Sequence, residues 1–220
     1  MPAIAVVLAV KELTNAKTRL TEAVPDREDL VLAMFADTVD AVRAAGVEHV
    51  VVVSLDADVA AWARRHQVTH VGDAERDSSL NAAFALGAEV ARAGDHELSA
   101  IALLQADIPA LRPAEFASAI IAAGPHPRAV VADRDGTGTT MLVRHPHVTE
   151  MSSFGPGSAA AHRTAGAVDL DPLGHNWPGL RTDVDTLADL AAAAELGVGE
   201  HTASWIQGRR SAVARARDAS

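Results

Sequence analysis

The strongest constraint on the fold is an alternation of short apolar runs with longer Ala-rich stretches. Runs rich in Val, Ile and Leu occupy residues 3–10, 47–53, 68–71 and 99–104, and each has the length of a buried strand. The segments between them space their apolar residues as helices do. This order is typical of an α/β protein whose mixed, mostly parallel sheet is covered by helices on both faces.

Capping and breaking residues predict where the helices begin and end. The predicted helices are 25–45 before Gly46, one from a cap at Asp56 or Asp58 to His66, one from Ser78 or Ser79 to Ala93, then 113–123, 158–164 and 187–196. In the second half, strands are predicted at 129–132, 140–144 and 168–170. The turn-forming stretch 135–138 between the first two favours a β-hairpin.

Length and charge indicate one domain with a distinct tail. The 220 residues are 49% hydrophobic, which is enough for one hydrophobic core. The sequence shows no linker and no repeat. Four arginines and one aspartate fall in residues 207–220, so residues 1–206 keep 15 basic and 28 acidic side chains, a net charge of −13. We expect a domain over 1–206 and a basic, disordered tail over 207–220, because polar termini without apolar anchors usually fray.

Composition also excludes several classes of protein. A body this acidic repels nucleic acid, and 3% aromatic residues leave few stacking platforms. There is no cysteine, hence no disulfide framework and no zinc–thiolate site. The apolar start is too short to span a membrane and lacks the basic region of a signal peptide. We therefore expect a cytoplasmic enzyme for a small molecule, with no nucleic-acid or membrane partner.

A basic loop follows the first apolar run, where ligands of open parallel sheets bind. It holds the only two lysines of the chain, Lys11 and Lys17, together with Arg19. With backbone N–H groups, these cations could neutralise a polyphosphate. The glycine spacing of a P-loop is absent, which disfavours ordinary ATPase or GTPase chemistry. The alternative is a solvated basic loop without a ligand.

Three aspartates follow apolar segments further along the chain. Asp107 ends the run Leu103-Leu104-Gln105-Ala106, and an extended backbone places Asp183 and Asp185 on one face. Asp185 could instead cap the helix that follows it. Carboxylates from two loops are the ligands Mg²⁺ takes when it also binds phosphates. A set of carboxylates opposite a basic loop is typical of enzymes that catalyse nucleotidyl transfer.

The chain resembles the phosphoenolpyruvate or 2-phospho-L-lactate guanylyltransferases of coenzyme F420 biosynthesis. The matching stretches are A-K-T-R-L at 16–20, Q-A-D-I-P at 105–109, D-x-x-G-T-G-T-T at 133–140, F-G-P-G-S at 154–158 and T-D-V-D-T at 182–186. They occur in family order over nearly the whole chain. The resemblance implies the Rossmann-like nucleotidyltransferase (GT-A-like) fold.

The resemblance also implies roles for individual residues. Asp107, Asp183 and Asp185 would hold Mg²⁺. The phosphorylated three-carbon acid would contact Thr140, Gly155 and Ser158. Lys17 and Arg19 would be the catalytic cations of the phosphate loop, Lys17 also binding the nucleotide, and Asn81 would lie near the guanosine with the Gly72-Asp73 loop. His162 is given no role, because a single helical histidine is more often structural.

The function implied is transfer of GMP from GTP to phosphoenolpyruvate, giving enolpyruvyl-diphospho-5′-guanosine and pyrophosphate. The alternatives keep the fold and change the acceptor to 2-phospho-L-lactate, 3-phosphoglycerate or another phosphorylated compound. A further alternative is a nucleotide-binding domain without turnover, since fold alone does not establish activity. Transient contact with the downstream transferase of the pathway is a hypothesis.

Overall fold

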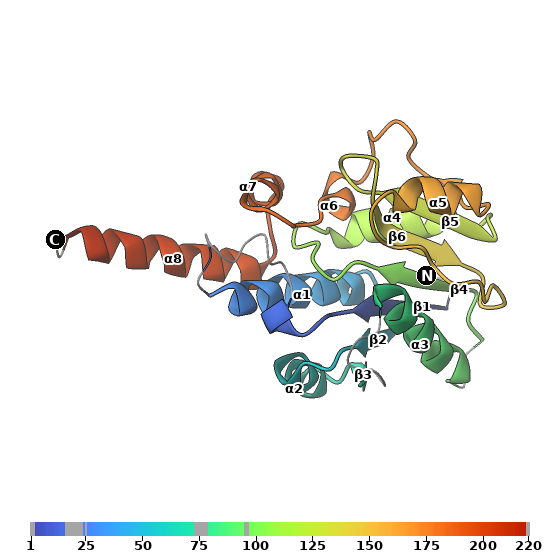
Figure 1. The fold of residues 1–220 in the computed structure, drawn as a ribbon, viewed down its shortest axis with the longest axis horizontal. Helices are drawn as coiled ribbons and strands as arrows, with labels where there is room; N and C mark the ends of the chain where they lie inside the picture. The colour runs from blue at the N-terminus through green and yellow to red at the C-terminus, as the bar shows by residue number, and fades with distance from the viewer. Residues whose placement is uncertain (1–2, 16–23, 25, 73–78, 95–96, 219–220) are drawn as a thin grey trace.

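The computed structural model describes residues 3–15, 24, 26–72, 79–94 and 97–218. The strands are β1 (Ile4–Ala9), β2 (His49–Val53), β3 (Thr69–Val71), β4 (Ala100–Leu104), β5 (Arg128–Ala132), β6 (Thr139–Arg144) and β7 (Val168–Asp169). The helices are η1 (Leu13–Asn15), α1 (Arg27–Ala44), α2 (Ala57–Arg65), α3 (Leu80–Ala93), α4 (Pro113–Ala123), α5 (Ser158–Thr164), α6 (Pro178–Arg181), α7 (Leu187–Leu196) and α8 (Glu200–Asp218). Figure 1 shows their arrangement.

The strands form one sheet in the order β3-β2-β1-β4-β6-β5-β7. Strands β3, β2, β1 and β4 pair in parallel, whereas β6 runs antiparallel to both β4 and β5, and β7 returns parallel to β5. The predicted mixed, mostly parallel sheet is confirmed, and so is the β5–β6 hairpin. Two halves are named here: the parallel half (β3, β2, β1, β4) and the hairpin half (β6, β5, β7).

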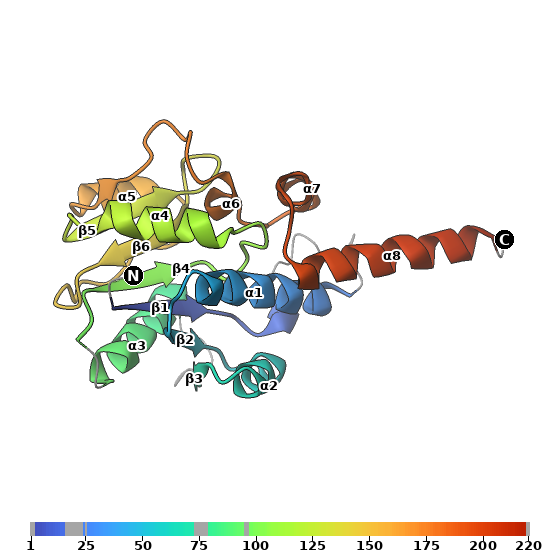
Figure 2. The ribbon, with the colours of Figure 1, turned by 180° about the vertical axis from the view of Figure 1, so that it is seen from behind.

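Helices cover both faces of the sheet, because its central strands are apolar on both sides. Along β1, Val6 and Leu8 pack on one face while Ala5 and Val7 pack on the other. Helices α3 and α5 cover the face toward the viewer in Figure 1, and α1 and α4 cover the opposite face, seen in Figure 2. The two hydrophobic clusters are therefore the two layers of a single domain.

Side-chain caps settle two alternatives left open by the sequence. Asp56 caps α2 by accepting hydrogen bonds from the backbone N–H groups of Asp58 and Val59. Ser79 caps α3 by accepting from the N–H of Ala82. Each cap satisfies helix N–H groups that have no partner inside the helix. The local sequence therefore specifies where both helices begin.

The C-terminal segment differs from its expected form. The segment from Gln207 onward was expected to be a disordered tail, but its backbone continues helix α8 to Asp218. This is consistent with the helix propensity of its Ala and Arg residues. Helix α8 begins where Asp37 of α1 accepts hydrogen bonds from the N–H groups of His201 and Thr202. Its far end projects from the body of the molecule in Figure 1. Asp37 is 164 residues from His201, so no local pattern predicts this helix start.

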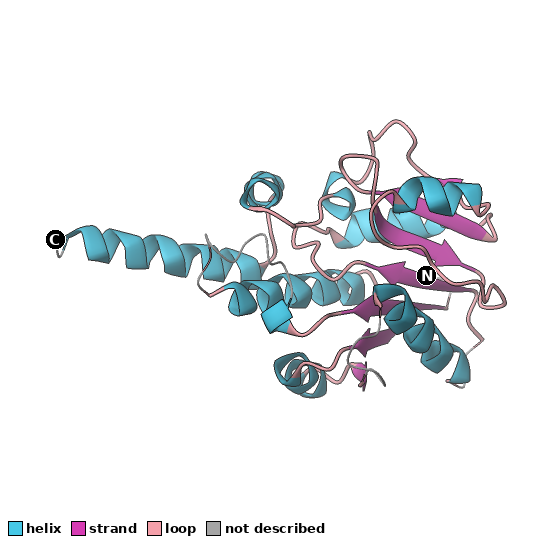
Figure 3. Ribbon diagram, in the orientation of Figure 1, coloured by secondary structure: helices cyan, strands magenta, loops and turns pink. Residues whose placement is uncertain are grey.

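The short helices η1 and α6 were also not predicted, because three or four residues leave no periodic signal. Among the described residues, no helix is both long and apolar enough to cross a membrane. Loops gather beyond the carboxyl ends of the parallel strands, as Figure 3 shows. Among the predicted site residues that the structure describes, the segments that carry Asp107, Asp183 and Asp185 lie side by side.

Candidate active site

The Q-A-D-I-P segment leaves the carboxyl end of β4, at the centre of the sheet. Its first residue, Gln105, donates its N–H to the carbonyl of Thr140, at 2.9 Å. On the other side, the hydroxyl of buried Thr38 accepts from the N–H of Ile108 at 3.1 Å. Asp107 is held between these bonds and is 8% exposed. Thr38 comes from α1, so its part in holding this segment has no sequence signal.

A backbone hydrogen bond joins this segment to T-D-V-D-T. The N–H of Val184 donates to the carbonyl of Asp107 at 3.1 Å. Val184 lies between Asp183 and Asp185, so the structure brings the backbones of all three predicted metal ligands together across more than 70 residues of sequence. Buried Val184 anchors the segment in the core.

Arg181 fastens T-D-V-D-T to the hairpin half. Its buried guanidinium donates to the carbonyls of Ala132 and Asp133 and to the carboxylate of Asp171, at 3.2, 2.7 and 3.0 Å. Burial by itself would raise the pKa of Asp171, but hydrogen bonds from Asn176, His175 and Arg181 lower it. The Asp171 carboxylate is therefore charged and hydrogen-bonded at both oxygens, the condition under which a buried ion pair is tolerated.

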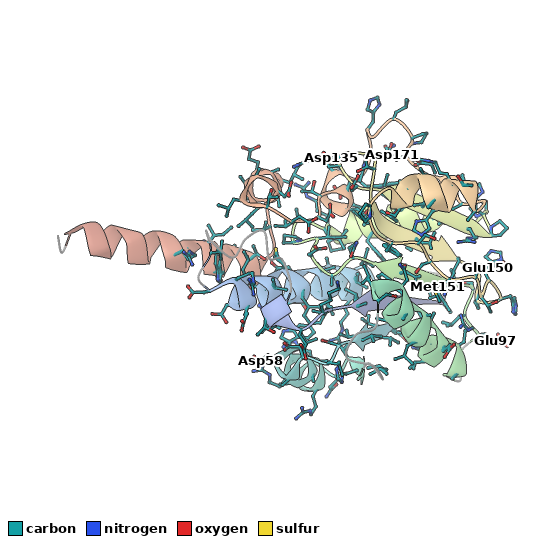
Figure 4. All side chains as sticks on the ribbon, in the orientation of Figure 1. Asp58, Glu97, Asp135, Glu150, Met151 and Asp171 are labelled. Carbon is teal, nitrogen blue, oxygen red and sulfur yellow. The ribbon has the colours of Figure 1, made fainter. Side chains whose placement is uncertain are left out.

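An open cavity of about 300 Å³ lies beside these segments. Its lining is mostly acidic: Asp133, Arg134, Asp135, Asp183, Asp185, Thr186 and Asp189. Asp189 accepts from Arg134 at 2.8 Å and from the Thr186 hydroxyl at 2.7 Å. Burial by itself would raise the pKa of Asp189, but hydrogen bonds from Thr186 and Asp185 and the charge of Arg134 lower it. Figure 4 labels Asp135, one of these lining residues, and Asp171 close to it in that view.

The donor chemistry of the three predicted ligands fits Mg²⁺, which binds carboxylate oxygens and keeps several waters. Asp183 and Asp185 line the cavity, whereas Asp107 is buried beside it. Within the part of the chain that the structure describes, no three His, Asp or Glu side chains are already arranged to hold a metal ion. The segments are adjacent, but their carboxylates do not form a ready coordination shell.

Asp133 builds the D-x-x-G-T-G turn between β5 and β6. Its carboxylate accepts from the N–H groups of Thr137 and Gly138 at 2.9 and 2.7 Å. Gly138 is required by close approach, because a Cβ there would lie 2.3 Å from the Asp133 carboxylate. The carbonyl of Thr137 then accepts from the N–H of Ala159 in α5, at 3.1 Å. The turn and the F-G-P-G-S segment therefore form one unit.

The predicted acceptor residues lie in this unit with different accessibility. Gly155 is exposed with φ +135°, a conformation that favours glycine. Ser158 is 1% exposed, and its hydroxyl has no hydrogen-bond partner among the described residues. Thr140 is fully buried and its hydroxyl donates to the carbonyl of Val131 at 3.4 Å. Gly155 and Ser158 are neighbours at the start of α5, and Thr140 lies inside the hairpin.

Asn81 was predicted near the nucleotide, but its side chain is hydrogen-bonded to the F-G-P-G-S segment. It accepts from the N–H of Phe154 and donates to the carbonyl of the same residue. His162, to which the sequence assigned no role, is fully buried and accepts from the N–H of Ser153. The Asn81 contact has no signal in the linear sequence, since Asn81 and Phe154 are 73 residues apart.

The predicted catalytic cations Lys17 and Arg19, and Asp73 of the predicted guanosine loop, lie outside the described residues. The start of the basic loop is described. Lys11 is exposed after β1, and the N–H of Leu13 donates to the carboxylate of Asp56 at 2.9 Å. Asp56 therefore links the basic loop to the cap of α2.

Comparison with known proteins gives consistent matches. The chain is 44% identical over 209 residues to a phosphoenolpyruvate guanylyltransferase of Mycolicibacterium gilvum, covering 92% of this chain and 94% of that protein. It is 46% identical over 202 residues to a protein of the same name from Salinispora arenicola, covering 90% of this chain and 91% of that protein. These relatives match nearly end to end.

Solved structures support the same fold at lower identity. A nucleotidyl transferase from Methanothermobacter has a TM-score of 0.61 at 16% identity, covering 88% of this chain and 97% of that one. A 4-diphosphocytidyl-2C-methyl-D-erythritol synthase from Anaerococcus prevotii has a TM-score of 0.58 at 11% identity, covering 89% and 96%. The predicted nucleotidyltransferase fold is confirmed. The family model described as guanylyl transferase CofC like matches residues 4–217, so this nucleotidyltransferase chain belongs to that family.

Proposed function

We propose that this chain transfers the guanylyl group of GTP to phosphoenolpyruvate and releases pyrophosphate. The observation that carries the proposal is the identity of 42–46% to proteins named phosphoenolpyruvate guanylyltransferase, each match covering at least 90% of this chain. The convergence of four of the five family segments at one edge of the sheet supports it. The fifth segment, A-K-T-R-L, lies outside the described residues.

The reaction needs positioning and charge neutralisation more than proton transfer. The phosphate of the acceptor is mostly dianionic at neutral pH, because the second pKa of a phosphate monoester is about 6. One of its oxygens forms a bond to the α-phosphorus of GTP, while the bond from that phosphorus to the bridging oxygen breaks. The electron pair leaves with pyrophosphate, so no general base is required.

We propose Asp107, Asp183 and Asp185 as the ligands of Mg²⁺. When bound, the ion supplies positive charge between two anionic substrates and to the departing pyrophosphate. The hydrogen bond from Val184 to the carbonyl of Asp107 keeps the two ligand segments adjacent. Lys17 and Arg19, proposed from the sequence, supply further positive charge toward the phosphates.

The acceptor is proposed to bind at Gly155 and Ser158, next to Thr140. The buried Ser158 hydroxyl has no partner among the described residues, so its O–H can donate to a phosphate or carboxylate oxygen. Gly155 lets a ligand approach the backbone closely, because it has no Cβ. Thr140 supports this site through its backbone, since its hydroxyl is used inside the hairpin.

The test incubates purified protein with GTP, Mg²⁺ and one acceptor at a time, and measures pyrophosphate release and product mass. Phosphoenolpyruvate is expected to give the highest kcat/KM. Higher kcat/KM with 2-phospho-L-lactate, 3-phosphoglycerate or a sugar phosphate would transfer the proposal to that acceptor. GTP binding without pyrophosphate release in the presence of any acceptor would support a non-catalytic domain instead.

The metal ligands are tested by charge-neutral substitutions. Asp107→Asn and Asp185→Asn are each expected to lower kcat/KM by about 100-fold or more and to weaken binding of Mn²⁺, measured by calorimetry. Glu97→Gln is the matched control, because exposed Glu97 lies before β4 at the other end of the strand (Figure 4). Unchanged metal binding in both aspartate variants would refute the assignment.

We further propose a cytoplasmic enzyme that hands its product to a downstream transferase. A diphosphate linked to an enol is a reactive group-transfer donor, so transient contact with the consuming enzyme limits hydrolysis. Coupled rates with both enzymes are expected to exceed those with the enzymes separated by a dialysis membrane. Equal rates, corrected for diffusion, would contradict this hand-off.

A further inference from the structure

The segment before Gly155 is held by side chains from two different helices. We propose that Asn81 and His162 are positioning residues that fix the backbone of residues 152–154, called here the clamp segment, for binding of the phosphorylated acceptor. This inference rests on the proposed function, because it concerns the acceptor site of that reaction. It gives Asn81 a role different from the nucleotide contact that the family resemblance implies.

Asn81 uses both ends of its amide on the clamp segment. Its Oδ1 accepts from the N–H of Phe154 at 2.7 Å and from the hydroxyl of Ser152 at 2.8 Å. Its Nδ2 donates to the carbonyl of Phe154 at 3.0 Å. Asn81 therefore satisfies both backbone groups of Phe154, as a neighbouring strand does in a sheet. It lies in the first turn of α3, so this helix start is tied to the acceptor side.

His162 fixes the residue between these two contacts. Its Nε2 accepts from the N–H of Ser153 at 2.9 Å, which requires Nε2 to carry no proton. The proton of the neutral ring is then on Nδ1, which donates to the Thr139 hydroxyl at 3.0 Å. Burial, and then the charge of Arg128, lower the pKa of His162 to about 4, so this form persists at neutral pH.

Aromatic packing completes the clamp. The ring of Phe154 lies 4.5 Å from that of Phe84 in α3 and 5.2 Å from the imidazole of His162 in α5, measured between centroids. The clamp segment is thus held from both helices that cover this face of the sheet. Phe154 is 6% exposed, so its ring is also an anchor in the core.

The position of the clamp segment gives it a function beyond stability. Directly after it come Gly155 and Gly157, whose φ angles are +135° and +72°. Glycines give a loop many accessible conformations, and holding one of them costs entropy. Fixing Phe154 on one side, with Ser158 in α5 on the other, leaves the loop pre-organised for its ligand.

The test separates the KM values of the two substrates. Asn81→Ala removes three hydrogen bonds and is expected to raise KM for phosphoenolpyruvate by about 10-fold or more, with KM for GTP and kcat each changed less than 3-fold. Asn81→Asp keeps both acceptor contacts but places a second carboxylate oxygen against the carbonyl of Phe154, so it is also expected to raise KM for phosphoenolpyruvate. His162→Gln, which retains an acceptor, is expected to be milder than His162→Ala.

The matched control is Arg163→Ala, in the same helix as His162. It removes an exposed ion pair with Asp169 of β7 and is expected to leave both KM values unchanged. Amide hydrogen exchange at Ser153 and Phe154 gives a readout independent of activity, and protection there is expected to fall in Asn81→Ala and His162→Ala. If wild-type protein uses no acceptor, the proposed function fails, and the exchange result alone decides the clamp.

Three outcomes would overturn the clamp. One is unchanged protection at Ser153 and Phe154 in folded variants, and another is an equal rise of both KM values. The third is a rise confined to KM for GTP, which would return Asn81 to the nucleotide site. Should Asn81→Ala fail to fold, His162→Gln gives the same comparison with a smaller expected change.

Discussion

The parallel half and the hairpin half of the sheet are stabilised in different ways. Every residue of β1 and β4 is apolar, and their described side chains pack into the two hydrophobic layers. The hairpin strands instead carry buried polar residues: Arg128, Thr139, Thr140 and Arg144. Two strands of the same sheet, β4 and β6, thus lie next to each other with different chemistry.

The difference extends to the segments beyond the strands. In the hairpin half, the carboxylates of Asp133 and Asp171, the guanidinium of Arg181 and the imidazole of His162 all bond to backbone groups of loops. Apolar burial is non-directional and tolerates substitution of similar size. A buried polar contact is directional, and losing one partner leaves the other unsatisfied. In the half proposed to bind the acceptor, the described loops therefore depend on directional contacts that a single substitution can break.

Arg181→Met is expected to have the largest effect on stability. It leaves buried Asp171 charged without its cation and two carbonyls, of Ala132 and Asp133, without their donor. Breaking a buried ion pair costs about 3–5 kcal/mol, and we expect a loss of that size in the free energy of urea unfolding. The Arg181→Met, Asp171→Asn double variant is expected to lose less than the sum of the single changes. A loss below about 1 kcal/mol in the single variant would contradict this comparison.

The second effect is a pH dependence confined to the hairpin half. The pKa of His162 is about 4 in the folded chain against 6.5 in an ordinary histidine. Between these values the unfolded chain binds more protons, so stability is complete above pH 6.5 and falls as the pH drops toward 4. The difference amounts to about 3 kcal/mol.

The measurement is urea unfolding at several pH values between 7 and 4, for wild type and His162→Gln. The variant is expected to lack this component of the slope. The carboxylates of Asp171 and Asp189, whose pKa values are lowered, lose their contributions only below about pH 3.8. Identical slopes above pH 4.5 in the two proteins would refute the role of His162.

The parallel half could be predicted from the sequence because its signals are local. Apolar runs identify β1, β2 and β4, and local caps such as Ser79 identify helix starts, because both signals lie within a few residues of each other. The sequence also predicted that Asp107 lies near the Asp183/Asp185 pair, and the hydrogen bond from Val184 to the carbonyl of Asp107 joins the backbones of these segments. What the sequence could not predict were contacts between distant residues, such as Asn81 with Phe154 or Asp37 with the start of α8. These depend on packing that exists only in the folded chain.

Gly87→Ala tests the parallel half without touching the site loops. A Cβ at Gly87 in α3 would lie 2.3 Å from Cγ1 of Val7 and 2.9 Å from Cγ2 of Val53, so helix and sheet must separate. Overpacking of this kind costs about 1–3 kcal/mol, partly offset by the better helix propensity of Ala. We expect lower stability with unchanged KM for the acceptor. The same change at Gly208, where nothing lies within 4 Å of the added Cβ, is the control and is expected to be neutral or stabilising.

The smallest expected effect separates helix capping from the proposed metal binding at T-D-V-D-T. Helix α7 is capped by Thr186, whose hydroxyl accepts from the N–H of Asp189 while the Asp189 carboxylate accepts from the N–H of Thr186. The cap is therefore not Asp185, the alternative that the sequence left open. Thr186→Ala is expected to lower the free energy of unfolding by about 1 kcal/mol.

Asp185→Asn is expected to affect activity rather than stability. It lowers kcat/KM while changing the free energy of unfolding by less than about 0.5 kcal/mol. Chemical unfolding and steady-state rates of the two variants, measured on the same preparations, check both statements. A loss of stability in Thr186→Ala and a loss of activity in Asp185→Asn would mean that Thr186 has a structural role and that the adjacent Asp185 has a chemical one. If Thr186→Ala lost activity as strongly as Asp185→Asn, the start of α7 would belong to the site rather than support it.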